Sequence, residues 1–371
     1  MTQPVAAYLH IPFCDRLCPY CDFAVVTGRG SEADRYLAAV ESEIHDDAPA
    51  VPLEAVFIGG GTPSSVPATS IARLLTALGE RHGLADPEVT MESNPEHLTP
   101  ELVEGLVAAG VNRLSMGAQS FDPAVLRALG RQHGPDDIRA GVEVAKGAGM
   151  GSVSLDLIFG HPLETDASWG ATLGAAIASG ADHISTYALT VERGTALSRS
   201  IAEGAPAPDE DVQADRFEAA VERLGSAGFE HYEVSNHGRP GHRCRYNAEV
   251  WAGRPYLAYG LGAHGFRDGA RFRNVRAFDA YVARVEAGEG PRQGVDPLDA
   301  WEREVDRFMI GLRLRGGVAL GEAGAAFVTS GAGARLVAMG VLEVRDGLAR
   351  VVDPLLTDGV AREVIGLSPP R

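Results

Sequence analysis

Three of the four cysteines of the chain lie in one short segment, H-I-P-F-C-D-R-L-C-P-Y-C-D-F. Cys14, Cys18 and Cys21 have the spacing C-x3-C-x2-C. Zinc sites usually use paired C-x2-C knuckles and four N or S ligands, so a zinc ion here would need His10 as its fourth ligand. Three thiolates in one loop can instead hold a 4Fe-4S cluster and leave one iron open to a further ligand. We therefore predict a 4Fe-4S cluster in loop 14–21, with zinc or three unconnected thiols as the alternatives.

The segments around this loop alternate short apolar runs with amphipathic stretches. Six runs have the length and composition of buried strands, namely 6–11, 55–61, 89–93, 113–117, 154–159 and 183–189. Apolar residues at helical spacing follow them in 31–47, 69–82, 99–109, 136–147, 167–179 and 209–228. Six successive β-then-α units predict an α/β fold, an incomplete (β/α)6 barrel of the TIM type with parallel strands.

The β-then-α alternation stops after the sixth unit, which predicts a change of domain. We assign residues 1–267 to the partial barrel and expect 268–295, charged and rich in glycine, to be a linker. Residues 296–371 then form a small C-terminal α+β domain. Its helical stretches precede a hairpin in which Asp346-Gly347 supplies the turn. Helices followed by such a hairpin predict a winged-helix-like domain.

Charge and hydropathy exclude several classes of protein. The formal net charge of -17 argues against binding to a nucleic-acid backbone or to an anionic membrane. The sequence has no run of about 20 apolar residues, so we expect no transmembrane segment. Its first residues lack the basic and apolar regions of a secretory signal. We therefore expect a cytoplasmic protein, in which disulfides are rare.

The cysteine spacing after a first strand resembles the radical S-adenosylmethionine (SAM) superfamily, whose members bind SAM at the open iron of a 4Fe-4S cluster. Further motifs resemble the oxygen-independent coproporphyrinogen III oxidase family within it. They are Y-L-H-I-P-F-C, G-G-G-T-P at 59–63, E-S-N-P at 92–95, R-L-S-M-G-A-Q-S-F at 113–121 and D-L-I-F-G-H-P at 156–162. The resemblance covers residues 5–265 and extends to the small terminal domain.

The resemblance implies a set of cofactor-binding residues, most of which follow predicted strands. Gly60, Gly61 and Thr62 would cradle the amino group of SAM, and Arg131 suits its carboxylate because a guanidinium binds carboxylates in a bidentate way. The other implied contacts are Tyr8, Tyr20, Glu92, Gln119, Asp156 and Ala188. The implied metal ligands are Cys14, Cys18 and Cys21.

The family that the motifs resemble has two branches. One is the dehydrogenase that oxidises the propionates of coproporphyrinogen, which typically has a longer N-terminal extension and continues its cluster loop as Cys-x-Cys. This chain starts close to its first strand and continues Cys21-Asp22-Phe23, as in the second branch, the heme chaperones. We therefore predict a heme chaperone that hands heme to an acceptor protein and needs an electron donor. The alternatives are the dehydrogenase and a radical enzyme with another substrate. The sequence therefore does not decide whether the protein is an enzyme.

The heme chaperone branch typically carries an H-N-x-x-Y-W motif, and here the matching stretch departs from it. Residues 244–251 read C-R-Y-N-A-E-V-W, with Tyr246 in place of the histidine. The heme-iron ligand is therefore open among His237, His242, Cys244 and Tyr246, all of types known to bind heme iron. The same loop contains Arg239, Arg243 and Arg245, and we expect these to pair with heme propionates.

Overall fold

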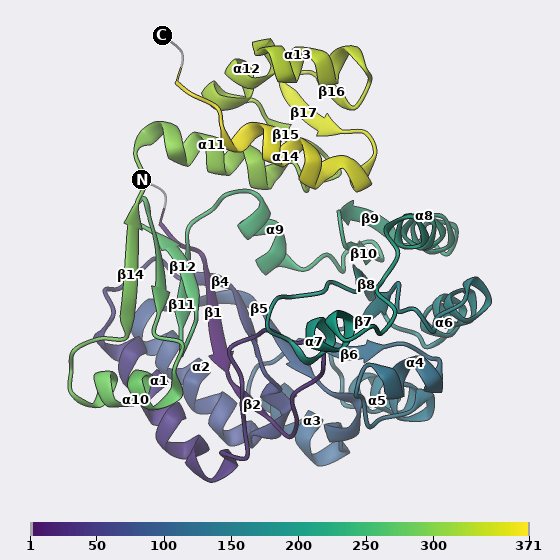
Figure 1. Cartoon of the computed structure of the whole chain (residues 1–371). Coiled ribbons are helices and arrows are strands. Elements are labelled where there is room, and N and C mark those ends of the chain that lie inside the picture. The colour runs from purple at the N-terminus through teal and green to yellow at the C-terminus, as the bar shows by residue number, and fades with distance from the viewer. Residues whose placement is uncertain (1–2, 370–371) are drawn as a thin grey trace.

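The computed structural model describes residues 3–369, and its centre is a run of six parallel strands. These are β1 (Ala6–Ile11), β4 (Leu53–Gly60), β5 (Leu84–Ser93), β6 (Arg113–Gln119), β7 (Ser152–Phe159) and β8 (His183–Ala188). Each strand pairs in parallel with the next. The sheet curves without closing (Figure 1), which confirms the predicted incomplete barrel.

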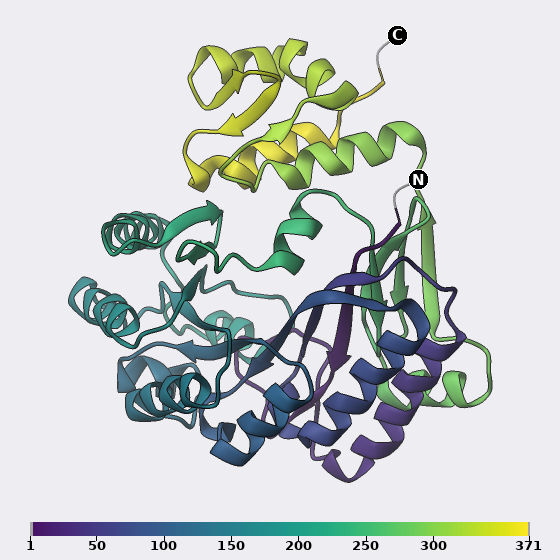
Figure 2. The same ribbon diagram turned by 180° about the vertical axis from the view of Figure 1, so that it is seen from behind.

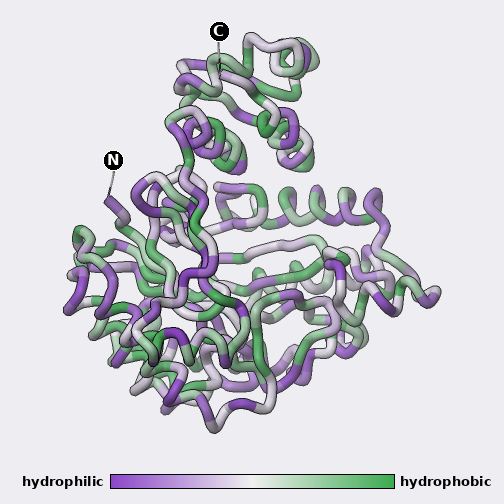
Figure 3. Tube along the Cα trace, turned by 60° about the vertical axis from the view of Figure 1, so that its left-hand side comes forward, coloured by the Kyte–Doolittle hydropathy of each residue, from purple (hydrophilic) through white to green (hydrophobic). Residues whose placement is uncertain are grey.

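Helices cover the outer face of this sheet, because alternate residues of each strand are apolar. In β1, Ala7, Leu9 and Ile11 are buried under the helices, whereas Tyr8 and His10 lie on the inner face of the barrel. The covering helices are α1 (Ala33–Asp46), α2 (Ala68–His82), α3 (Pro100–Ala108), α5 (Pro135–Gly147), α6 (Asp166–Ala178) and α8 (Glu210–Ser226). Hydrophobic and hydrophilic residues alternate along their turns (Figure 3), as expected of amphipathic helices.

Helix starts follow the sequence signals. Thr99 caps α3, accepting a hydrogen bond from the backbone N–H of Leu102, and a proline occupies the first position of that helix. Asp209 caps α8 in the same way through Val212. Two short helices, α4 (Pro123–Ala128) and α7 (Ala196–Ala202), were not anticipated. No helix in the part of the chain that the structure describes is long and apolar enough to span a membrane.

The sheet continues beyond the predicted barrel on both sides, to twelve strands. On one side β8 pairs antiparallel with β10 (Asn236–Gly238), which pairs with β9 (Glu230–Glu233). On the other, β11 (Tyr256–Tyr259) pairs in parallel with β1. Beyond β11 follow the antiparallel strands β12 (His264–Arg267), β13 (Ala270–Asn274) and β14 (Arg292–Pro297).

The expectation that residues 268–295 form a linker is wrong. They contain β13, helix α10 (Phe278–Glu286) and part of β14. The charged residues of this segment lie on the exposed faces of these elements, while Tyr281, Val282 and Val285 are buried in the main core. The division of the chain into a barrel and a C-terminal domain stays a prediction.

The C-terminal part of the chain has an apolar core of its own, centred on Phe308 and Phe327. Its elements are α11 (Ala300–Gly311), β15 (Val318–Ala319), α12 (Gly321–Thr329), α13 (Gly331–Ala338), β16 (Leu342–Arg345), β17 (Leu348–Val351) and α14 (Thr357–Ile365). The three strands form a small antiparallel sheet. These elements are a mixture of helices and a small antiparallel sheet, as expected, and the winged-helix-like arrangement stays a prediction.

The two ends of the barrel carry different structures. The strands β2 (Phe13–Cys14) and β3 (Val26–Thr27) bracket the cysteine loop at the carboxyl end of β1. Helix α9 (Arg245–Trp251) lies at the opposite end, between the barrel and the C-terminal elements (Figure 1). The view from behind shows the same order, with β1 pointing away from the C-terminal elements (Figure 2).

We expect the substitution Tyr281→Phe to destabilise the barrel, because 268–295 is part of its core. The Tyr281 hydroxyl is buried and donates a hydrogen bond to Glu43 at 2.7 Å. Loss of a buried donor to a carboxylate costs about 1–3 kcal/mol of unfolding free energy, measurable by chemical denaturation. Val295→Ala, at a position 60% exposed on β14, is the control and should change stability by less than about 0.5 kcal/mol. Equal stabilities of the two variants would contradict this packing.

Candidate cofactor site

A cavity of about 410 Å³ opens at the carboxyl ends of the barrel strands. Because parallel strands end at one edge, loops far apart in the sequence meet there. All three clustered cysteines line this cavity. Nine of the ten residues implied as SAM contacts line it too, namely Tyr20, Gly60, Gly61, Thr62, Glu92, Gln119, Arg131, Asp156 and Ala188.

The cysteine loop is held from several sides. The backbone N–H of Leu197 donates to the carbonyl of Pro19 at 2.7 Å, and His97 Nε2 lies 2.9 Å from an Asp15 carboxylate oxygen. The three thiols are partly buried and form no disulfide. Burial raises the pKa of the Cys14 thiol to about 11, against the opposing effect of a hydrogen bond from Thr62. A bound metal would therefore have to displace the proton, as thiolate ligands require.

The donor set fits an iron–sulfur cluster better than a single zinc ion. His10, the ligand that zinc would need, has both ring nitrogens engaged. Nδ1 lies 3.0 Å from the hydroxyl of Tyr8, and Nε2 lies 2.7 Å from the carbonyl of Ala24. Within residues 3–369, no three His, Cys, Asp or Glu side chains lie close enough together to hold one ion. Three thiols around a shared cavity match the ligands of a 4Fe-4S cluster with one open iron.

The glycine segment 59–61, at the end of β4, forms a cradle that only glycine allows. Gly60 has φ +122°, and a Cβ there would lie 2.7 Å from the ring of His10. A Cβ at Gly59 would lie 2.8 Å from Glu92, and one at Gly61 2.7 Å from the carbonyl of Pro12. The backbone therefore comes within reach of a ligand in the cavity. Gly60 also donates its N–H to Glu92 Oε2 at 3.0 Å.

Two partly buried carboxyl groups, Glu92 and Asp156, line the cavity beside the glycine segment. Burial, and secondly the charge of Asp156, raises the pKa of Glu92 to about 7, although the N–H of Gly60 opposes this. Burial also raises the pKa of Asp156, which accepts hydrogen bonds from the Ser115 hydroxyl at 3.0 and 3.1 Å. Such carboxyl groups can accept hydrogen bonds from ribose hydroxyls or from an ammonium group. A cation bound nearby would favour their ionised forms.

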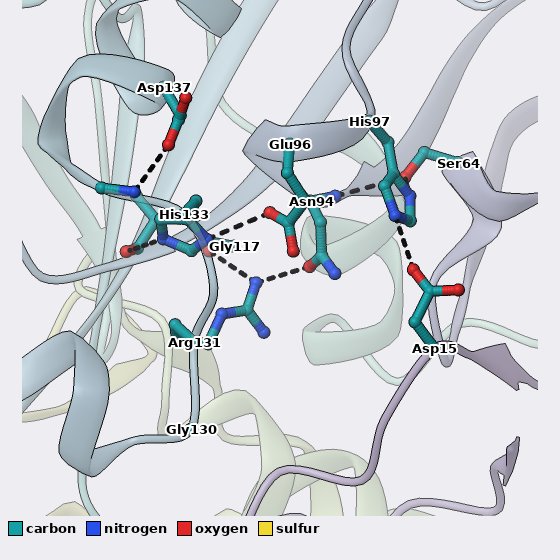
Figure 4. A network of polar contacts seen from close by, with 12 residues as sticks. Asp15, Ser64, Asn94, Glu96, His97, Gly117, Gly130, Arg131, His133 and Asp137 are labelled. Carbon is teal, nitrogen blue, oxygen red and sulfur yellow. Dashed lines mark hydrogen bonds and ion pairs between the residues drawn. The ribbon is translucent and has the colours of Figure 1, made fainter.

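Arg131 is positioned by a network of polar contacts (Figure 4), and its Nη1 lies 3.7 Å from Cys18 Sγ. Its Nη2 donates to Asn94 Oδ1 at 2.5 Å and to the carbonyl of Gly117 at 3.0 Å. The neighbouring Glu96 is paired with His133 at 3.1 Å. Burial disfavours the ionised form of Glu96, but His133 and Arg131 outweigh it and lower its pKa to about 2. Because Glu96 is engaged elsewhere, the guanidinium can still bind a ligand carboxylate.

Several residues of this site were not singled out from the sequence. Asn94 lies within the E-S-N-P motif, which was the only signal for it. Asp15, Glu96 and His97 have no signal in their spacing, because they meet only after folding. Gln119 has φ +63°, where β6 departs from regular pairing, and a left-handed conformation of a residue other than glycine is typical of functional sites.

Tyr8 does not line the cavity with the other implied contacts. Its ring lies on the inner face of the barrel against Phe57 and Tyr246, at centroid distances of 6.3 and 6.4 Å. Its hydroxyl reaches the site only through His10, whose other nitrogen bonds the cysteine loop at Ala24. The structure thus gives Tyr8 a supporting position behind the cavity.

The loop with the heme-ligand candidates lies at the opposite end of the barrel. Arg113, the first residue of β6, donates to the carbonyl of His242 at 3.0 Å. His242 Nδ1 lies 3.2 Å from the hydroxyl of Ser152, the first residue of β7. Arg245 pairs with Glu54 near the start of β4. These contacts involve strand starts, whereas the cavity lies at strand ends.

The four ligand candidates differ in accessibility. His237 is fully buried, stacked on His231, and neither of its ring nitrogens has a hydrogen-bond partner. Burial raises the pKa of the Cys244 thiol to about 11, and burial likewise raises that of Tyr246. Only His242 and Tyr246 are partly exposed.

The three arginines that were expected to bind propionates have protein partners. Arg243 forms an ion pair with Glu230 at 3.0 Å, and Arg245 one with Glu54. Arg239 lies over the ring of Phe229. An acidic ligand would have to compete with these contacts.

Comparisons with known proteins agree with the geometry. Residues 8–176 match the model of the Radical SAM superfamily. The chain is 41% identical to the heme chaperone HemW of Mycobacterium tuberculosis, over 87% of this chain and 85% of that protein. It is 39% identical to the HemW of Synechocystis, over 85% and 79%. Its fold is similar to that of coproporphyrinogen III oxidase (HemN) from Escherichia coli, with TM-score 0.84 and 21% identity over 98% of this chain and 90% of that one.

We expect Glu92→Gln to flatten the pH dependence of stability in the cofactor-free protein. The folded pKa of Glu92 is raised, so ionisation costs stability as pH rises from about 4.5 to about 7. A shift of this size corresponds to roughly 3 kcal/mol, most of which the variant should recover at pH 8. Glu218→Gln, at an exposed position, is the control, and its stability should depend on pH as that of the wild type does. Parallel denaturation curves for wild type and Glu92→Gln across this range would refute the assignment.

Proposed function

The chain belongs to the radical SAM superfamily and, within it, to the family of the HemW heme chaperones, and we propose on this basis that it binds heme and delivers it to an acceptor protein. The observation that carries the proposal is the 31–41% identity to several heme chaperones named HemW, over about 85% of this chain. The likeness to the oxidase rests on 21% identity and concerns the fold alone.

For the cofactors, we propose that Cys14, Cys18 and Cys21 hold a 4Fe-4S cluster and that SAM binds at its open iron. When bound, the cluster and SAM together supply one-electron chemistry at the sulfonium, for which an electron donor is a required partner. The residues of the chain would position SAM. The glycine cradle would bind its amino group and Arg131 its carboxylate. Glu92 and Asp156 would accept hydrogen bonds from its hydroxyl or ammonium groups.

For heme, we propose a site at the strand-start end of the barrel, formed by segment 237–246, which runs from the end of β10 into α9, and by the rest of α9. The contacts of His242 and Arg245 with strand starts support this placement. Strands rise about 3.3 Å per residue, so Glu54 and Gly60 in β4 lie roughly 20 Å apart. Heme held there would lie outside the reach of a radical formed in the cavity. This separation favours delivery of heme over oxidation of a porphyrin.

The experiment is to compare cluster loading, heme binding and turnover in the wild type and in the variant C14S/C18S/C21S. After anaerobic reconstitution, we expect the triple variant to lose nearly all iron and acid-labile sulfide, because serine is a poor ligand for the cluster. It should still bind heme with unchanged stoichiometry, followed at the Soret band. Wild type with SAM, reductant and coproporphyrinogen should form no protoporphyrinogen.

Formation of protoporphyrinogen would overturn the chaperone assignment in favour of the dehydrogenase. Cluster iron retained in the triple variant would overturn the ligand assignment. Heme binding in single variants of His237, His242, Cys244 and Tyr246 identifies the iron ligand. A variant with unchanged heme spectrum removes its residue from the set.

A further inference from the structure

Two side chains of the cavity donate hydrogen bonds to cysteine sulfurs. Thr62 Oγ1 lies 3.6 Å from Cys14 Sγ, and Arg131 Nη1 lies 3.7 Å from Cys18 Sγ. Both are within the range for hydrogen bonds to sulfur. One donor is a neutral hydroxyl and the other a guanidinium, so the two differ in charge.

We propose that Thr62 and Arg131 raise the reduction potential of the 4Fe-4S cluster through these bonds to Cys14 and Cys18, in addition to contacting SAM. The proposal rests on the cluster assignment above. Reduction adds one electron to the cluster from an external reductant, with no bond broken and no proton transferred. Hydrogen bonds to ligand sulfurs and nearby positive charge stabilise the more negative reduced state.

The surrounding structure fixes both donors. The backbone N–H of Thr62 donates to the carbonyl of Phe13 at 2.8 Å, which ties Thr62 to the residue before Cys14. The Thr62 side chain is buried, so its hydroxyl has few alternative partners. If Thr62 moved, it would lose the hydrogen bond of its backbone N–H as well as the hydrogen bond of its hydroxyl to sulfur.

Arg131 is fixed more strongly still. Its Nη2 is held by Asn94 and Gly117, which leaves Nη1 directed at Cys18. The preceding Gly130 has φ +73°, and a Cβ there would lie 2.8 Å from the side chain of Pro19. This glycine allows the arginine loop to approach the cysteine loop closely. Because a charged donor acts here in a largely buried place, its effect should exceed that of Thr62.

The test is a redox titration of the reconstituted cluster without SAM, with dithionite as reductant and the reduced cluster followed by EPR. In Arg131→Met we expect the ratio of reduced to oxidised cluster at a fixed potential to fall about tenfold, a shift of about 59 mV for one electron. Thr62→Val, which keeps the shape and removes the hydroxyl, should lower the ratio by a smaller factor. Arg131→Lys retains a charged donor and should restore part of the effect.

Arg16→Met is the control, because it removes one positive charge from the cysteine loop at an exposed position, where solvent screens the effect of that charge on the cluster. Arg16 Nη1 donates to the carbonyl of Gly130 at 3.5 Å instead of to a sulfur. We expect its potential to stay close to that of the wild type. Equal potentials in Arg131→Met, Thr62→Val and wild type, at full cluster content, would overturn the inference and leave the proposed function intact.

Iron and sulfide are assayed in every variant, so the two proposals fail in different ways. A wild type that takes up no cluster contradicts the cofactor assignment itself, and the inference with it. If Arg131→Met fails to load, Thr62→Val and Arg131→Lys decide the question by the same titration.

Discussion

The parallel pairing of six strands is the constraint on which the rest of the structure depends. It places the carboxyl ends of β1, β4, β5, β6, β7 and β8 at one edge, so that loops separated by up to about half of the chain line one cavity. The cysteine loop, the glycine cradle, two partly buried carboxyl groups and a partly buried guanidinium meet there. None of them could form this site alone, because residues from other strands and loops hold them in place. His10 supports both the cradle and the cysteine loop, and Asn94 supports Arg131.

The same pairing creates a second end, where the strands begin. Segment 237–246 and α9 lie there, together with the ion pair between Arg245 and Glu54. The aromatic contacts of Tyr246 with Tyr8 and Phe57 lie in the barrel interior between the two ends. Under the proposed function, SAM would bind at one end and heme at the other, so heme would be held away from radical chemistry. Such a separation would explain how a chaperone can retain the scaffold of an enzyme superfamily.

Much of this could be predicted from the sequence, because the signals are local. The apolar runs and helical spacing predicted the six strands and their helices, and the cysteine spacing predicted the loop at the mouth of the cavity. The edges of the sheet could not be predicted, because β9 to β14 are short and several carry alternating charges that resemble a linker. Partners such as Asp15 and His97 meet only through tertiary folding. The ion pair of Arg245 could not be predicted because Glu54 lies far away in the sequence, and that of Arg243 because nothing in the sequence shows that Glu230 faces it.

The most direct test of the central claim is the position of heme iron relative to the cluster. Crystals of the reconstituted, heme-loaded protein would give both positions from the anomalous scattering of iron. The account predicts a cluster at Cys14, Cys18 and Cys21 and a heme iron near segment 237–246, roughly 20 Å away according to the rise per residue of a strand. Heme iron inside the cavity, in contact with the SAM site, would contradict it.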